Sequence, residues 1–152
     1  MTQVVSFDNV FYTHVLKELQ SIIRQQFEGR TVYINPEKQD DNEEFSVRIW
    51  GLDSELDEQY AGLEGWRRKY NTEIVLYQKI ETPNDLVWEQ FFRDTERLQQ
   101  LLYNNTKIDG SSNLGWFEGN VTEMIIGADE VINDEKIYAV RFEFSCRINR
   151  HS

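Results

Sequence analysis

The chain of 152 residues is short of cysteine, histidine and positive charge. Its one cysteine, Cys146, excludes an intramolecular disulfide and a zinc site built from several thiolates of one chain. Sixteen Lys and Arg residues stand against 27 Asp and Glu residues, which gives a formal net charge of -11. Binding to nucleic acid over a wide surface is therefore not expected, because phosphate neutralisation requires clustered Lys and Arg.

Long apolar runs are also missing. No stretch approaches the 18 or more consecutive apolar residues of a membrane-spanning helix. The first fifteen residues, MTQVVSFDNVFYTHV, contain no basic region followed by an apolar run, so the sequence predicts no signal peptide. We therefore expect a cytoplasmic protein without a membrane partner.

The sequence contains few residues that could perform catalysis. His14 falls inside a predicted helix, where we expect it on the flank, and His151 lies next to the last residue. Neither has a nucleophile or an orienting carboxylate at a meaningful spacing. A Gly-rich phosphate loop, a nucleophile elbow and a paired-histidine motif are all missing. We predict that the protein is not an enzyme and uses no cofactor.

Two segments have helical periodicity. Between Asn9 and Phe27, apolar residues recur at steps of three and four, with Ser6 or Asp8 as the cap and Gly29 after the end. The second segment starts at Thr82-Pro83-Asn84-Asp85, with Thr82 as the predicted cap, and runs to about Asn104. Both helices are amphipathic, so each needs an apolar surface to cover.

Five segments have the features of strands. The clearest is IYAVRFEFSCRI, Ile137 to Ile148, in which apolar and other residues alternate strictly. The other four are Thr31–Ile34, Phe45–Trp50, Ile74–Ile80 and about Trp116–Ala128, and DEVINDE is expected to connect the last pair. The order α-β-β-β-α-β-β predicts an α+β fold in a single domain over residues 1–152, with two helices packed on a mainly antiparallel β-sheet.

Residues 51–69 are predicted to form a long protruding loop between two paired strands. The loop combines acidic residues with Trp and Arg, which frequently anchor protein interfaces. Our hypothesis is a subunit interface that includes this loop and the polar face of the last strand: Asp53, Glu55, Asp57, Tyr60, Trp66, Arg67, Arg68, Arg141, Glu143 and Arg147. Two alternatives remain: Trp66 folds back on the sheet edge, and the strand's polar face is a solvated surface with cross-strand charge pairs.

The same loop partly fits a calcium-binding template. Asp53, Glu55 and Asp57 occupy its first, third and fifth positions. The sixth position needs a glycine for its sharp turn, but Glu58 stands there. We therefore predict a solvated acidic segment and no metal.

The order of elements resembles the tail terminator proteins of tailed bacteriophages, also called tail completion or neck proteins. The matching features are the helix from Phe11 to Phe27, the strand pair Phe45–Trp50 and Ile74–Ile80, the helix starting at Thr82-Pro83, and the strand Ile137–Ile148. The resemblance spans nearly the whole chain and rests on no signature residue.

The resemblance implies a structural virion protein. Such proteins form a ring, typically of six copies, that caps the tail tube and joins it to the neck. The implied partners are further copies of the chain, a tail tube protein and a neck or connector protein, while DNA only passes through the lumen. The implied location is the tail or neck of the virion, and the host cytoplasm during assembly.

Two other readings stay open. An acidic inhibitor that mimics nucleic acid and blocks a DNA-binding enzyme would agree with the charge of -11. Such a mimic needs carboxylates spaced along one face, whereas the acids here cluster in predicted loops, at Asp40 to Glu44 and Asp53 to Glu58. An enzyme with an unrecognised site is the third reading, and a cavity with convergent polar groups would support it.

Overall fold

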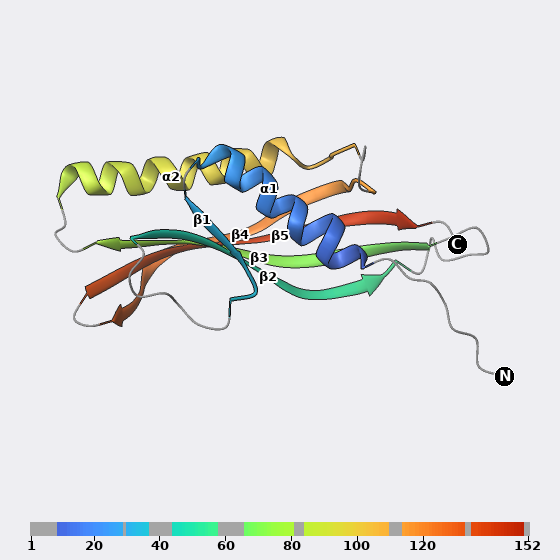
Figure 1. Cartoon of the computed structure of the whole chain (residues 1–152), viewed down its shortest axis with the longest axis horizontal. Coiled ribbons are helices and arrows are strands. Elements are labelled where there is room, and N and C mark those ends of the chain that lie inside the picture. Colours follow the sequence, from blue (N-terminus) through green and yellow to red (C-terminus); the bar gives the residue numbers. More distant parts are fainter. Residues whose placement is uncertain are drawn as a thin grey trace.

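The computed structural model describes residues 9–28, 30–36, 44–57, 66–80, 84–109, 114–132 and 135–150, and only the backbone at 66, 123–132, 135–136 and 150. Two helical segments lie on one side of a five-stranded sheet (Figure 1). The predicted α+β class and the order α-β-β-β-α-β-β are confirmed.

The first helical segment has two parts. Its start, η1 (Phe11–Leu16), is a π-helix, and α1 (Lys17–Gln26) continues it as an α-helix. The helix predicted between Asn9 and Phe27 is thus confirmed, although its first part is wound more widely than the α-helical period assumes. The segment ends where the backbone N–H of Phe27 bonds to the carbonyl of Ile23. The caps proposed at residues 6, 8 and 29 lie outside the described residues.

The sheet has the strand order β1-β2-β3-β5-β4. Its strands are β1 (Thr31–Ile34), β2 (Phe45–Leu56), β3 (Trp66–Ile80), β4 (Phe117–Ile132) and β5 (Glu135–Arg150). Only β1 and β2 run parallel, and the other neighbouring strands are antiparallel. The central positions of β3 and β5 agree with their strong apolar patterns, while β1 and β4 form the two edges.

The predicted loop over residues 51–69 is wrong for most of its length. β2 continues to Leu56 and β3 begins at Trp66, and the two strands pair in register from Phe45↔Gln78 to Leu56↔Arg68. A bulge between Gly51 and Asp53 interrupts the ladder once. The extension lacks apolar alternation, so periodicity could not detect it. The connection is reduced to residues 57–65, and residues 58–65 lie outside the described part of the chain.

Two further boundaries differ from the prediction. β4 continues to Ile132 and β5 resumes at Glu135, so most of DEVINDE is strand. The second helix, α2 (Asp85–Asn104), is capped by Asn84, whose Oδ1 accepts a hydrogen bond of 3.0 Å from the N–H of Val87. Asn at the cap replaces the expected Thr82, because its side chain reaches the third N–H of the helix. The predicted end at Asn104 is confirmed.

Both helices cover the apolar face of β5. α1 packs over β1, while α2 packs over β3 and β4. The edge-to-face rings of Trp88 and Tyr138, with centroids 4.7 Å apart, join α2 to β5. The apolar residues of β5 share one core with residues of the two helices: Val140, Phe142, Phe144, Cys146 and Ile148 with Leu19, Ile23, Phe91, Leu98 and Leu102. The buried face therefore specifies where the helices lie.

Gly119 should tolerate alanine less well than Gly51. A Cβ at Gly119 would lie 2.7 Å from the Cα and 2.8 Å from the carbonyl oxygen of Thr106. The backbone cannot withdraw without loss of the 2.7 Å hydrogen bond from Gly119 N to Thr106 O. We expect Gly119→Ala to lower the free energy of unfolding by about 1–3 kcal/mol. Urea denaturation measures this loss.

Gly51→Ala is the matched control. Its Cβ would approach the side-chain ends of Leu16 and Phe11 at 3.2 Å, and side chains can rotate away. Its loss of stability should be smaller. An equal or larger loss of stability for Gly51→Ala would contradict the conclusion that the backbone of Thr106 leaves no room for a side chain at Gly119.

Cys146 should be chemically inert in the folded protein. Burial raises the pKa of its thiol from an ordinary value of 9.0 to about 12. The thiolate is the reactive form, so a disulfide reagent at pH 8 should label Cys146 only when the protein unfolds. The stability from this neutral thiol is fully present below pH 9.0 and is lost as the pH rises toward about 12. Labelling of native protein at the rate of a free thiol would contradict this placement.

Candidate interaction surface

The face of the sheet opposite the helices is called the open face here. Residues paired across strands share a face, so the pairing defines its members. The open face includes Arg48 of β2, Glu73 of β3 and Arg141 of β5, together with Tyr33, Ser46, Trp50, Asn71, Val75, Tyr77, Glu143, Ser145 and Arg147. Charged and aromatic side chains alternate across it, in contrast to the apolar side under the helices.

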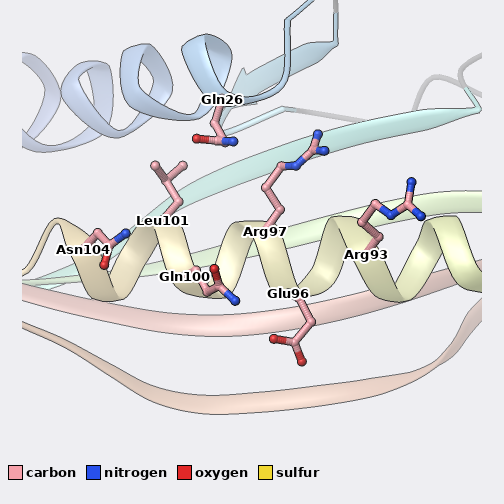
Figure 2. A pocket seen from close by; sticks show the side chains of 7 residues that line it. All are labelled: Gln26, Arg93, Glu96, Arg97, Gln100, Leu101 and Asn104. Carbon is pink, nitrogen blue, oxygen red and sulfur yellow. The ribbon is translucent and has the colours of Figure 1, made fainter.

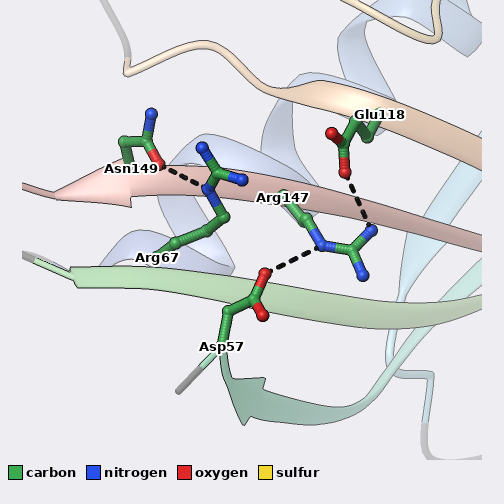
Figure 3. A network of polar contacts seen from close by, with 5 residues as sticks. All are labelled: Asp57, Arg67, Glu118, Arg147 and Asn149. Carbon is green, nitrogen blue, oxygen red and sulfur yellow. Dashed lines mark hydrogen bonds and ion pairs between the residues drawn. The ribbon is translucent and has the colours of Figure 1, made fainter. Parts of the chain in front are cut away.

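At one end of the open face, Arg147 joins three strands (Figure 3). Its Nε lies 3.2 Å from Oδ2 of Asp57, and its Nη1 lies 3.3 Å from Oε2 of Glu118. Beside it, Arg67 Nε donates to Oδ1 of Asn149 at 2.9 Å. Asp57 directly follows β2, while Glu118 belongs to β4, so the network ties the ends of neighbouring strands together. Because these groups are partly exposed, each ion pair contributes about 0–1 kcal/mol.

The middle of the open face carries a row of like charges, formed by Glu73 of β3 and Glu143 of β5, which stand directly opposite each other. Carboxylates in this arrangement repel. Two contacts oppose the repulsion: Arg141 Nε lies 4.0 Å from Oε1 of Glu73, and Thr122 Oγ1 donates to Oε2 of Glu143 at 3.2 Å.

A buried arginine occupies the β1 end of the same face. Arg48 is only 4% exposed, and its guanidinium lies 4.7 Å from the ring centroid of Tyr77 and 5.8 Å from that of Tyr33. Its Nε also donates to Ser46 Oγ at 3.3 Å. Aromatic rings stabilise a desolvated cation through their negative faces. The stack was not predicted from the sequence, where the alternation of Arg48 with Val47 and Ile49 is the one feature that points to it.

A shallow hollow of about 360 Å³ lies on the open face between the Glu143 row and the Arg147 network. Asn71 and Asp53 hydrogen-bond within it at 2.5 Å. Leu52, Lys69, Thr72, Thr122, Phe144 and Ser145 complete its lining with Glu143. Four of its polar side chains are engaged with one another, through the Asn71–Asp53 and Thr122–Glu143 hydrogen bonds.

The structure brings most of the predicted interface residues together, though not on a protruding loop. Seven lie on or beside the open face: Asp53, Glu55, Asp57, Arg67, Arg141, Glu143 and Arg147. Arg68 lies on the other face, opposite the buried Ile148, and its Nε donates to Ser54 Oγ at 3.1 Å. Tyr60 and the side chain of Trp66 fall outside the described part of the chain. The ion pairs of Glu73, Asp57 and Glu118 with arginines of β5 agree with the alternative interpretation, in which the polar face of the last strand carries cross-strand charge pairs.

A second groove of about 380 Å³ lies on the helix side (Figure 2). Gln26 at the end of α1 faces Arg97 and Leu101 of α2 across it, and Arg93, Glu96, Gln100 and Asn104 complete its lining. Next to Arg97 along α2, Asp94 is 1% exposed and accepts a hydrogen bond from Gln90 at 3.0 Å. Its Oδ2 has no hydrogen-bond partner. Burial of Asp94 was not predicted, although this residue falls on the apolar face of the helix, four residues before Leu98.

His14 is buried, not on a helix flank as expected. It is 7% exposed, and its Nδ1 accepts a hydrogen bond of 3.2 Å from the N–H of Leu114. This bond ties η1 to the segment that precedes β4, which explains the burial. In the described part of the chain, no group of three His, Cys, Asp or Glu side chains is arranged to hold a metal ion. Neither described helix has the length and apolarity needed to cross a membrane.

No protein-family model matches this sequence, and neither does any curated protein.

Replacement of Glu143 by glutamine should stabilise the protein. Glu143→Gln removes the repulsion from Glu73 but keeps an oxygen for Thr122, so the free energy of unfolding should rise by about 0.5 kcal/mol. Glu118→Gln is the matched control, because it removes an attractive partner of Arg147 and should lower stability by up to about 1 kcal/mol. Denaturant titration at low salt measures both. A loss of stability in Glu143→Gln would contradict the repulsive row.

Proposed function

We propose that this protein is a structural subunit that assembles with copies of itself into a ring, of the kind that caps a phage tail tube and joins it to the neck. The element order, α-β-β-β-α-β-β, is the order on which the resemblance to tail terminator proteins rests. In this role the chain binds a tail tube protein below and a connector protein above, while DNA passes through the lumen.

The outer edge of β4 carries the proposal. β4 is sixteen residues long and stands at the end of the sheet, and no other described strand pairs with its outer side. A long exposed edge presents unpaired N–H and C=O groups that attract other chains. A neighbouring subunit that covers this edge removes that hazard, and repetition of the same contact by rotation closes a ring.

The charge of the chain suits a lumen through which DNA moves. A net charge of -11 discourages adhesion of DNA to the ring, because like charges repel. The Arg residues of the open face do not offset this effect strongly, since Arg141 lies beside Glu73 and Arg147 lies between Asp57 and Glu118.

The same ion pairs make the inhibitor alternative weaker. A nucleic-acid mimic needs carboxylates that are free to replace phosphates along one face. On the open face, by contrast, Asp57, Glu73 and Glu118 each contact an arginine of β5. Glu143 in turn accepts a hydrogen bond from Thr122.

The native mass tests the proposed function. Six chains of 18.1 kDa give a complex of about 109 kDa, and a closed ring should keep that mass on dilution because every subunit makes two contacts. Light scattering over a concentration series measures it. Binding to purified tail tubes, measured by co-sedimentation, tests for assembly on a template.

A chain that stays monomeric at every concentration and does not sediment with tail tubes would overturn the proposal. In that case, inhibition of a DNA-binding enzyme becomes the next activity to measure.

A further inference from the structure

The open face contains a buried cation that has no acidic partner among the described residues. Arg48 of β2 is 4% exposed, and it is the one buried arginine of the described side chains. Four other arginines have a carboxylate within 4.0 Å, although their side chains are 28–55% exposed: Arg93, Arg97, Arg141 and Arg147. A buried charge normally has an opposite charge beside it, because removal of a lone ion from water is costly. Arg48 departs from this rule.

Two tyrosines from the strands on either side of β2 cover the guanidinium of Arg48. Tyr33 of β1 pairs directly with Arg48, and Tyr77 of β3 pairs with Ser46, two residues earlier on β2. The guanidinium carbon lies 5.8 Å from the ring centroid of Tyr33 and 4.7 Å from that of Tyr77. The Nε atom is engaged as well, since it donates to Ser46 Oγ at 3.3 Å. The Nη1 and Nη2 groups form the edge that these three contacts leave uncovered.

This Nη edge reaches the surface of the molecule. Among the described residues, Asp94 Oδ2 is the one fully buried side-chain nitrogen or oxygen without a hydrogen-bond partner. Arg48 donates a hydrogen bond there from Nε alone, so its two Nη groups are not sealed in the interior. Glu73, on the next strand, approaches Arg141 instead, with its Oε1 4.0 Å from the Nε of that residue. The Nη edge is therefore available to an acceptor that another molecule supplies.

We propose that the Nη edge of Arg48 binds a carboxylate group of another molecule. The two N–H groups along a guanidinium edge match the two oxygens of a carboxylate, and such paired, charged hydrogen bonds are stronger than those between neutral groups. Tyr33, Tyr77 and Ser46 already hold the guanidinium in place, so binding costs little side-chain entropy. This site does not depend on the proposed ring.

The surroundings favour a carboxylate that is carried on a protein side chain. Trp50 follows Arg48 by two positions on β2, so it shares the open face, and it is half-buried there. Trp, Tyr and Arg are the residues that most often anchor protein interfaces, and here they occupy three adjacent strands of one face. The net charge of -11 repels the phosphates of a nucleic acid. We therefore expect the ligand to be an Asp or Glu side chain of a partner protein.

Titration of the isotope-labelled protein with acetate tests the site, because acetate carries the carboxylate of an Asp or Glu side chain. At constant pH and ionic strength, the Nε–H signal of Arg48 in NMR spectra should shift and reach saturation, with a dissociation constant in the millimolar range. Acetamide, which has the same shape without the charge, should leave the signal in place at the same concentration. Arg147 is the matched control in the same spectrum, because Asp57 and Glu118 already engage it.

Arg48→Lys keeps the charge but loses the planar fork. It should weaken acetate binding about tenfold, as read from the backbone amides of Tyr33 and Tyr77. Its spectrum also identifies the Arg48 signal, which disappears. If this variant does not fold, the comparisons of acetate with acetamide and of Arg48 with Arg147 on the original chain decide. An equal shift of Arg147, an equal effect of acetamide, or undiminished binding by folded Arg48→Lys would overturn the site.

Two further ligands distinguish the source of the carboxylate. N-acetylglutamic acid N-methylamide carries the group on a peptide backbone, and it should bind Arg48 at least as tightly as acetate does. A site that binds acetate but excludes this blocked glutamate would overturn the protein partner and assign a small free carboxylate. Tighter binding of inorganic phosphate than of acetate would overturn the carboxylate in favour of a phosphate group.

Discussion

Burial of the apolar face of the sheet is the constraint on which the rest of the structure depends. The inner side chains of β3 and β5, such as Leu76, Phe142 and Phe144, are almost fully buried. They need other apolar side chains to pack against them. η1, α1 and α2 supply that cover, and their own apolar faces are satisfied by the same contacts. With both helices on one side, the open face must be stabilised by its own side chains. Among the described strands, β1 and β4 each have a neighbour on one side only.

The open face meets this requirement through pairs between neighbouring strands. Arg48 is held between two tyrosine rings, and Arg147 is held between two carboxylates of other segments. Other internal contacts engage Asp53, Arg67, Arg141 and Glu143, so most residues of the predicted interface already have partners within the chain. Contact with another subunit through the open face would therefore have to break or share these contacts. The outer edge of β4, by contrast, has no partner strand among the described residues, which is why the proposed ring contact lies there.

Apolar periodicity in the sequence predicts the parts of the fold that lie under the helices, but it does not detect the strand segments that extend beyond them. The inner residues Phe45, Val47 and Ile49 alternate with outer ones, so the first half of β2 is visible in the sequence. After Gly51 the side chains of β2 are exposed or half-buried, and Asp53, Ser54 and Glu55 give no apolar alternation. The sequence therefore predicts a loop at the interface residues, although the ladder continues to Leu56↔Arg68. The position of β4 at one edge of the sheet depends on strand order, which no local pattern in the sequence contains.

Amide hydrogen exchange along β4, compared between dilute and concentrated protein, tests the central claim most directly. Alternate N–H groups of an edge strand point away from the sheet and exchange readily unless another chain covers them. If a neighbouring copy covers this edge, exchange at the outward amides of β4 should slow markedly with concentration, while the central strand β3 remains equally protected in both samples. Equal exchange of β4 in the two samples, with the assembly present in the concentrated one, would contradict the claim that the edge is where copies meet.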